Sequence, residues 1–150
     1  MTISYNRLGS NGRLGNQMFQ YAALRGIAAH RGFDWLIPKP DSYGDSNYGL
    51  FDCFEMSSVQ ESNFGSLNAQ SISTGEFHFV QEFFDTCPDN VNLHDYFTTE
   101  KYFSNVSDLI RKDYTFKKEI LEPSKEIVEE LDSPIFIHIR RGDYLVKPEA

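Results

Sequence analysis

Two adjacent arginines, Arg140 and Arg141, come directly after an apolar stretch that ends at Ile139. Because Ile135–Ile139 is apolar at almost every position, it predicts a parallel strand buried on both faces. Strand alternation places His138 and Arg140 on the same face. Open α/β sheets bind ligands at the carboxyl ends of such strands, and a guanidinium can donate to two phosphate oxygens at once. The pattern therefore predicts a diphosphate-binding site.

These arginines also admit a structural interpretation. Arg140 could pair with an acidic residue of the core, and Asp143 could hold Arg141 or cap the turn that follows. The two interpretations differ in where Arg140 points. In a ligand site it shares a crevice with Asn16, whereas in a structural role it is locked against an internal carboxylate.

A glycine-rich loop near the start of the chain is a second candidate site. It runs from Gly9 to Gly15 between a predicted strand and a predicted helix, where backbone N–H groups are free to bind an anion. Its glycines are spaced three apart, which differs from the G-x-G-x-x-G pattern of dinucleotide-binding proteins. Arg13, Asn16 and Gln17 would add three polar groups to a cleft at this strand end. Alternatively, the glycines serve only a tight turn and close packing of the helix.

The elements around these loops indicate an α/β protein. Strands are predicted over Thr2–Leu8 and Phe33–Ile37, joined by a largely buried helix over Asn16–Arg31 that Gly32 caps. This order fits a strand–helix–strand crossover in a parallel sheet. Along the rest of the chain the sequence predicts a loop with short elements over Asp41–Gly75, a β-rich run over Glu76–Phe84 and a short strand over Val91–Phe97. An amphipathic helix is predicted to begin after Thr98 or Thr99. A short helix follows, whose first turn holds Pro123 and whose inward face carries Ile127, Val128 and Leu131.

The composition excludes several classes of protein. Of 150 residues, 40% are hydrophobic and 24% are charged, as in globular proteins rather than disordered ones. Asp and Glu number 22 against 14 Lys and Arg, so nucleic acid is not an expected partner. No apolar run approaches the ~20 residues that cross a bilayer. Neither the two cysteines nor the scattered histidines His30, His78 and His94 show the spacing of metal ligands. We therefore expect a cytoplasmic protein without a membrane span.

Together the two loops resemble motifs of the α-1,2-fucosyltransferase family. Gly12-Arg-Leu-Gly-Asn-Gln-Met-Phe-Gln-Tyr-Ala22 and His138-Ile-Arg-Arg-Gly-Asp-Tyr144 carry the likeness, and Asp95-Tyr-Phe-Thr-Thr-Glu-Lys-Tyr-Phe103 is similar to a third segment of the family. The resemblance implies the GT-B architecture of two Rossmann-like domains. Residues 1–133 would form the acceptor-side domain, and residues 134–150 would begin the donor-binding domain.

The resemblance also implies a reaction, which is the inverting transfer of L-fucose from GDP-fucose to the 2-hydroxyl of a galactoside without a metal or other cofactor. The early loop is in addition similar to that of protein O-fucosyltransferases, whose arginine and asparagine reach the reaction centre. Carried over by position, the implied site residues are Arg140, Arg13 and Asn16 as catalytic, and His138, Arg140, Arg141 and Asp143 as donor-binding. Two departures from the family pattern, Arg13 and Asp95 in place of glycines, concern the acceptor side.

The short segment after Ile139 leads us to expect a truncated transferase with little activity by itself, unless a second chain supplies the donor domain. In a truncated chain, Ile135–Ile139 would pair with the first sheet or remain partly exposed. Two other hypotheses remain open. A non-catalytic glycan-binding remnant would bind a galactoside but not GDP, and an ordinary nucleotide-binding domain would bind NAD or FAD through the Gly9–Gly15 loop.

Overall fold

The computed structural model describes residues 1–41 and 48–139. The chain divides into two compact units, Met1–Lys117 and Lys118–Ala150. No helix in the described part of the chain combines the length and the apolar character needed to cross a membrane.

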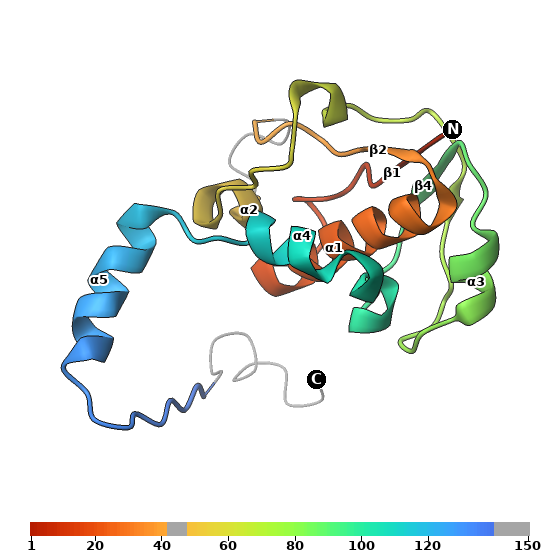
Figure 1. The fold of residues 1–150 in the computed structure, drawn as a ribbon. Coiled ribbons are helices and arrows are strands. Elements are labelled where there is room, and N and C mark those ends of the chain that lie inside the picture. Colours follow the sequence, from red (N-terminus) through yellow and green to blue (C-terminus); the bar gives the residue numbers. More distant parts are fainter. Residues whose placement is uncertain (42–47, 140–150) are drawn as a thin grey trace, which may run out of the picture. The chain divides into compact units, whose positions relative to one another are not determined.

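The first unit is built on a parallel sheet (Figure 1). Ile3 of the first strand pairs with Trp35 on one side and with Val91 on the other. The four strands are β1 (Thr2–Ser4), β2 (Asp34–Leu36), β3 (Ser71–Ile72) and β4 (Val91–Leu93), in the spatial order β2-β1-β4-β3. Parallel neighbours need a long crossover, and α1 (Leu14–Arg31) joins β1 to β2 while α3 (Gln81–Thr86) joins β3 to β4. The predicted α/β class and the first crossover are confirmed, and the sheet is compatible with a Rossmann-like fold.

Helix α1 lies along one face of this sheet (Figure 1). Its small and apolar residues bury most of its circumference, as the sequence predicts. The helix ends at Gly32, whose φ of 69° is the left-handed conformation of a C-terminal cap and whose N–H bonds to the carbonyls of Ala28 and Ala29. At Gly26 the backbone of Tyr102 comes so close that a Cβ atom would lie 2.0 Å from its carbonyl oxygen. Glycine is therefore required in the middle of α1.

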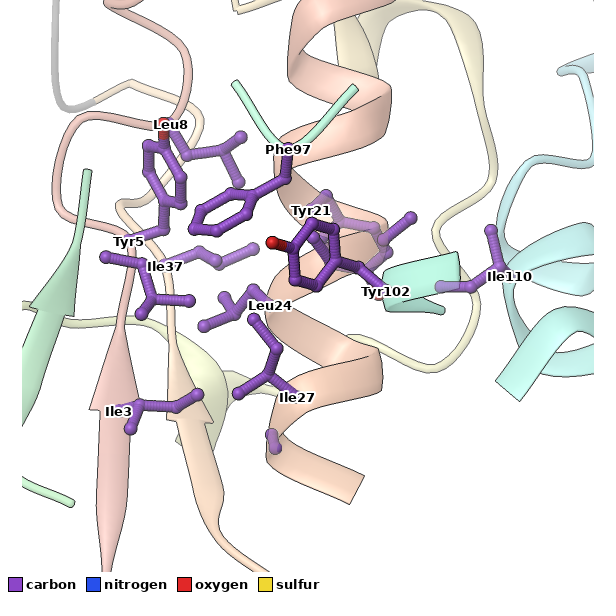
Figure 2. Close-up of a cluster of buried hydrophobic side chains, with 14 of the residues drawn as sticks. Ile3, Tyr5, Leu8, Tyr21, Leu24, Ile27, Ile37, Phe97, Tyr102 and Ile110 are labelled. Atoms are coloured by element: carbon purple, nitrogen blue, oxygen red, sulfur yellow. The ribbon is translucent and has the colours of Figure 1, made fainter. Parts of the chain in front are cut away.

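The core lies between α1 and the sheet. In Figure 2, Ile3 of β1 faces Leu24 and Ile27 of α1, and Phe97 and Tyr102 close the cluster from the chain that follows β4. These five side chains are at most 2% exposed. Burial of each contributes roughly 1.5 to 3 kcal/mol. The core therefore fixes α1 against the ends of β1 and β4, where the predicted glycine-rich loop lies.

The β-rich run predicted over Glu76–Phe84 is wrong. Its second half begins α3, and its first half is irregular. The aromatic side chains do not alternate between two faces of a sheet, because Phe79 and Phe84 both pack on the ring of Tyr102. Tertiary packing thus overrides local β propensity here.

The helix predicted to begin after Thr98 or Thr99 is only partly correct. Two short 3₁₀ turns, η2 (Glu100–Tyr102) and η3 (Ser104–Val106), precede α4 (Ser107–Asp113). Short elements also interrupt the long predicted loop, as expected. They are α2 (Gly49–Cys53), η1 (Glu61–Asn63) and the strand β3.

The second unit contains α5 (Lys118–Glu129), which holds Pro123 in its interior rather than in its first turn. The predicted inward face is wrong, since Ile127, Val128 and Leu131 are 63%, 43% and 47% exposed. Ile135–Ile139 is not a strand, and its isoleucines and phenylalanine are 72% to 89% exposed. A strand needs a hydrogen-bonded neighbour, and within the described residues none pairs with this segment. The expectation of exposure is confirmed, whereas that of a buried strand is not.

Candidate functional site at the carboxyl edge of the sheet

The loops that follow β1 and β4 lie side by side at the carboxyl edge of the sheet. The Tyr5 hydroxyl donates to the backbone carbonyl of Asp95, and the Asn6 N–H donates to Asn92 Oδ1 over 2.7 Å. Burial raises the pKa of Tyr5 to about 12, so its phenol remains a donor at neutral pH. Open α/β sheets bind ligands at this edge, and these bonds hold the two loops together there.

The glycine-rich loop turns tightly at this edge. The N–H groups of Ser10 and Asn11 both donate to the Arg7 carbonyl over 3.0 Å. At Gly12, φ is +79°, and a Cβ atom would lie 2.6 Å from that of Asn16. Gly12 is therefore required by the turn. Gly15 differs, because a Cβ atom there would meet nothing within 4 Å, so packing within the described residues does not explain it.

Of the three polar groups predicted to line a cleft, two keep accessible surface. Arg13 is exposed at the start of α1, and Asn16 is half-buried. Gln17 instead is fully buried, and its side-chain amide donates to the Gly12 carbonyl over 3.1 Å. Gln20, one turn later, donates to the Asn11 carbonyl over 3.1 Å. The two glutamines therefore hold the loop against α1, and the prediction that Gln17 lines a cleft is wrong.

Sequence reasoning missed three polar residues at the same edge. Arg7 Nη1 lies 3.3 Å from His94 Nε2, and the Tyr96 hydroxyl lies 3.5 Å from Asn11 Oδ1. Arg7 follows β1 and His94 follows β4, but both fall inside the longer strands predicted from the sequence, Thr2–Leu8 and Val91–Phe97, so the sequence offers no signal that they stand in loops at this edge. No spacing in the sequence indicates that the two side chains meet.

Asp95 fastens the end of β4 to the chain after β3. Its Oδ2 accepts bonds from Ser73 Oγ, Thr74 N and Thr74 Oγ1 over 3.0, 3.1 and 2.6 Å. Its Oδ1 accepts the Tyr96 N–H over 2.8 Å. Burial tends to raise the pKa of this carboxyl, but the bonds from Thr74, Tyr96 and Ser73 outweigh it and hold the pKa below its usual range. Asp95 thus has a structural role at this edge.

Acidification is expected to loosen the Asp95 contacts. Because the pKa is lowered in the folded protein, the stabilisation is fully present above the ordinary value of about 4 and is lost as the pH falls through the lower folded value. The amide NMR signals of Thr74 and Tyr96 should therefore shift together when the pH is lowered from about 6 to about 2. Asp95→Asn should remove this shared titration. Signals that stay in place in the wild-type protein would contradict the assignment.

The predicted donor-binding residues lie in the second unit. His138 is exposed there, whereas Arg140, Arg141 and Asp143 lie outside the described residues. Of the predicted site residues, Arg13 and Asn16 lie together at the start of α1 in the first unit, and the shared crevice of Arg140 and Asn16 stays a prediction. Within the described residues, no three His, Cys, Asp or Glu side chains converge as metal ligands.

Comparison with known proteins finds no family model, curated protein or solved structure that matches this chain.

Proposed function

We propose that this protein takes part in the transfer of L-fucose from GDP-fucose to the 2-hydroxyl of a galactoside. The observation that carries the proposal is the presence, in one chain, of both family-like motifs, the early one of which has Arg13 and Asn16 at the carboxyl edge of a parallel sheet. This edge is the ligand-binding edge of open α/β sheets. The finer assignments, namely the GT-B architecture, a donor domain that begins at residue 134 and a cytoplasmic location, belong to the same proposal.

The proposed chemistry depends on charge at the donor diphosphate. Breaking the fucosyl bond leaves negative charge on GDP and positive charge on the sugar. Arg140 would donate to the β-phosphate with Arg141 and His138 in support, while Asp143 orients the arginines. Because the charge on GDP grows during bond breaking, a preset guanidinium stabilises the transition state more than the bound substrate.

Arg13 and Asn16 would act at the other side of the reaction. Both stand at the N-terminal end of α1, where no acidic residue occupies the first turn. A guanidinium and an amide there can donate to the hydroxyls or phosphate oxygens of a bound sugar nucleotide. Gln17 and Gln20 hold the loop against α1 through their bonds to the Gly12 and Asn11 carbonyls.

The test of this proposal is GDP binding by the full chain, measured by titration calorimetry. Arg140→Ala should weaken binding about tenfold to hundredfold, the usual cost of losing a charged hydrogen-bond donor. Arg111→Ala is the matched control, because Arg111 is an exposed arginine on α4. It should leave the affinity unchanged.

The same titrations separate the competing functions. Binding of a galactoside without any binding of GDP would contradict the transferase and favour a glycan-binding protein. Binding of NAD or FAD that depends on Arg13 and Asn16 would favour an ordinary nucleotide-binding domain. Equal GDP affinity of the wild-type and Arg140→Ala chains would remove the chemical basis of the proposal.

A further inference from the structure

Arg7 and His94 meet where the two central strands of the sheet end. Arg7 comes shortly after β1 and His94 directly after β4, and Arg7 Nη1 lies 3.3 Å from His94 Nε2. A guanidinium has donors only, so in this contact the imidazole accepts through Nε2 and carries its proton on Nδ1. Good N–H hydrogen bonds span about 2.7 to 3.2 Å, so this contact of 3.3 Å is slightly longer than the usual range. Little stabilisation is lost if another acceptor replaces the imidazole.

No acid neutralises Arg7 in the described part of the chain. Arg25 and Lys39 each form an ion pair, whereas Arg7 forms none there. The carboxylate next to His94 in sequence, that of Asp95, is occupied by Ser73, Thr74 and the Tyr96 N–H. Arg7 is an exposed residue, so its guanidinium is accessible to an anionic ligand.

The surroundings of the pair are fixed and favour a negative ligand. The Arg7 carbonyl accepts the N–H groups of Ser10 and Asn11, which sets the backbone from which the guanidinium extends. The same loop leads into α1, whose first turn holds no acidic residue, so the positive end of the helix dipole is not offset there. Tyr96, 37% exposed on the neighbouring loop, reaches Asn11 with its hydroxyl and offers an aromatic ring at the same edge.

We propose that Arg7 and His94 form an oxyanion-binding subsite. An oxyanion between them would accept N–H bonds from the planar Arg7 guanidinium and a further bond from His94 Nε2, once the ring carries its proton there. The identity of the ligand rests on the proposed function. In that reaction the oxyanion is either the carboxylate of an acidic acceptor sugar or the diphosphate of the donor.

The experiment follows amide chemical shifts of the full chain during titration with galacturonate, galactose and GDP. Galacturonate and galactose share a ring skeleton and differ in a carboxylate, so galacturonate should bind about tenfold more tightly if the oxyanion belongs to the acceptor. Arg7→Gln and His94→Gln should each reduce that preference. Arg111→Gln on α4 is the control and should retain it. Unchanged amide spectra away from the substitutions would show that the variants are folded.

The GDP titration distinguishes the two sources of the oxyanion. If Arg7→Gln weakens GDP binding while galacturonate and galactose bind alike, the subsite is supported and belongs to the donor diphosphate. The proposal is overturned if Arg7→Gln changes neither GDP nor galacturonate affinity. Arg140→Ala tests the proposed function separately from the Arg7–His94 subsite. If this variant loses GDP binding but still prefers galacturonate to galactose, both proposals are supported. If the wild-type chain prefers galacturonate to galactose but does not bind GDP, the Arg7–His94 subsite is supported and the proposed function is contradicted.

Discussion

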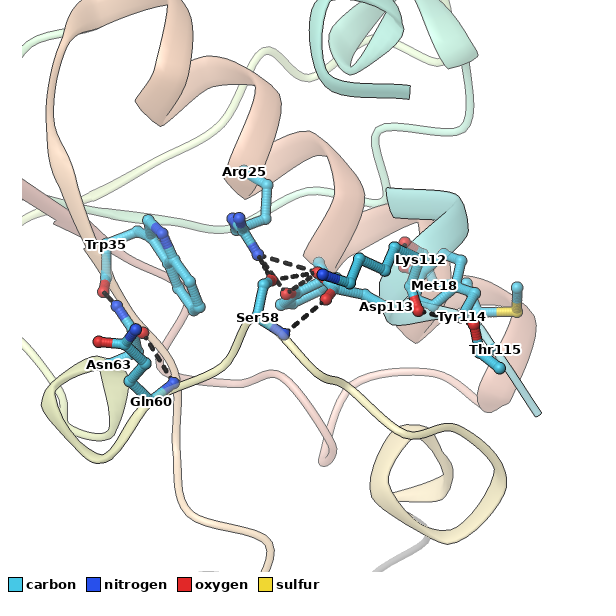
Figure 3. A network of polar contacts seen from close by, with 11 residues as sticks. Met18, Arg25, Trp35, Ser58, Gln60, Asn63, Lys112, Asp113, Tyr114 and Thr115 are labelled. Carbon is cyan, nitrogen blue, oxygen red and sulfur yellow. Dashed lines mark hydrogen bonds and ion pairs between the residues drawn. The ribbon is translucent and has the colours of Figure 1, made fainter. Parts of the chain in front are cut away.

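Asp113→Ala is expected to lower the free energy of unfolding by about 3 to 5 kcal/mol, the usual cost of removing one partner from a buried ion pair. Asp113 is fully buried, and its Oδ2 lies 3.0 Å from Arg25 Nη1, 2.7 Å from the Tyr21 hydroxyl and 2.6 Å from Ser58 Oγ. Its Oδ1 accepts the Ser58 N–H over 2.8 Å. Figure 3 shows Arg25 of α1, Asp113 of α4 and Ser58 converging. Alanine would remove the carboxylate that these donors share and leave the Arg25 charge without its anionic partner.

The other contacts of Arg25 do not replace the carboxylate. Arg25 Nη1 also donates to the Tyr21 hydroxyl and to Ser58 Oγ, but both oxygens are neutral. The ring of Trp35, whose centre lies 4.4 Å from the guanidinium carbon, offers only a cation–π contact. Burial raises the pKa of Tyr21 well above its usual value, so this phenol also remains a donor. The buried charge of Arg25 would therefore be uncompensated in the variant.

Chemical denaturation of the full chain measures this effect. Asp108→Ala, which removes an exposed carboxylate from the first turn of the same helix, should cost about 1 kcal/mol or less. Replacing both members of the pair, as in Arg25→Met with Asp113→Leu, should recover much of the loss, because no buried charge is then left alone. A single Asp113→Ala variant no less stable than Asp108→Ala would contradict the role of the pair.

Gly26→Ala is expected to destabilise the protein by about 3 kcal/mol, although alanine is the better helix former. The added Cβ atom would lie 2.0 Å from the Tyr102 carbonyl oxygen and 2.6 Å from the Phe103 Cα. Both are backbone atoms, so no side-chain rotation can relieve the contact. If α1 and the backbone at Tyr102 moved apart to make room, the hydrogen bond from Asn105 Nδ2 to the Gly26 carbonyl, which spans 3.0 Å, would also be strained.

Gly15→Ala is the matched control for this prediction, since Gly15 belongs to the same helix and a Cβ atom there meets nothing within 4 Å. That variant should be as stable as the wild type or more stable by up to about 1 kcal/mol. Thermal unfolding followed by circular dichroism compares the two variants directly. If they behave alike, the close approach of α1 and the Tyr102 backbone is not what requires glycine.

The early strand–helix–strand unit could be predicted because its signals are local. The apolar helix, Gly32 and the two flanking strands stand next to one another in sequence, and each has one dominant interpretation. The run over Glu76–Phe84 carries an equally strong β signal, but its aromatic side chains pack on Tyr102, which local pattern cannot reveal. The strand predicted over Ile135–Ile139 is wrong for a related reason, because strand formation depends on a partner elsewhere in the chain.

Part of the candidate site could likewise be predicted from local sequence and part could not. The turn at Gly12 and the placement of Arg13 and Asn16 follow from the glycine spacing between a strand and a helix. The contact of Arg7 with His94 joins residues 87 positions apart and exists because β1 pairs with β4. The adjacency of β1 and β4 in the order β2-β1-β4-β3 brings the two loops side by side, and a single sequence does not determine that order.

The central position of β1 also bears on how the protein is made. On the ribosome, β1, α1 and β2 leave the exit tunnel before β4 and can assemble at once, whereas the other edge of β1 awaits Val91. Until then the nascent chain presents an open row of backbone N–H and C=O groups, the kind of surface that recruits foreign strands. Nascent chains stalled before β4 should accordingly be more prone to misassembly and more dependent on chaperones than chains released after it.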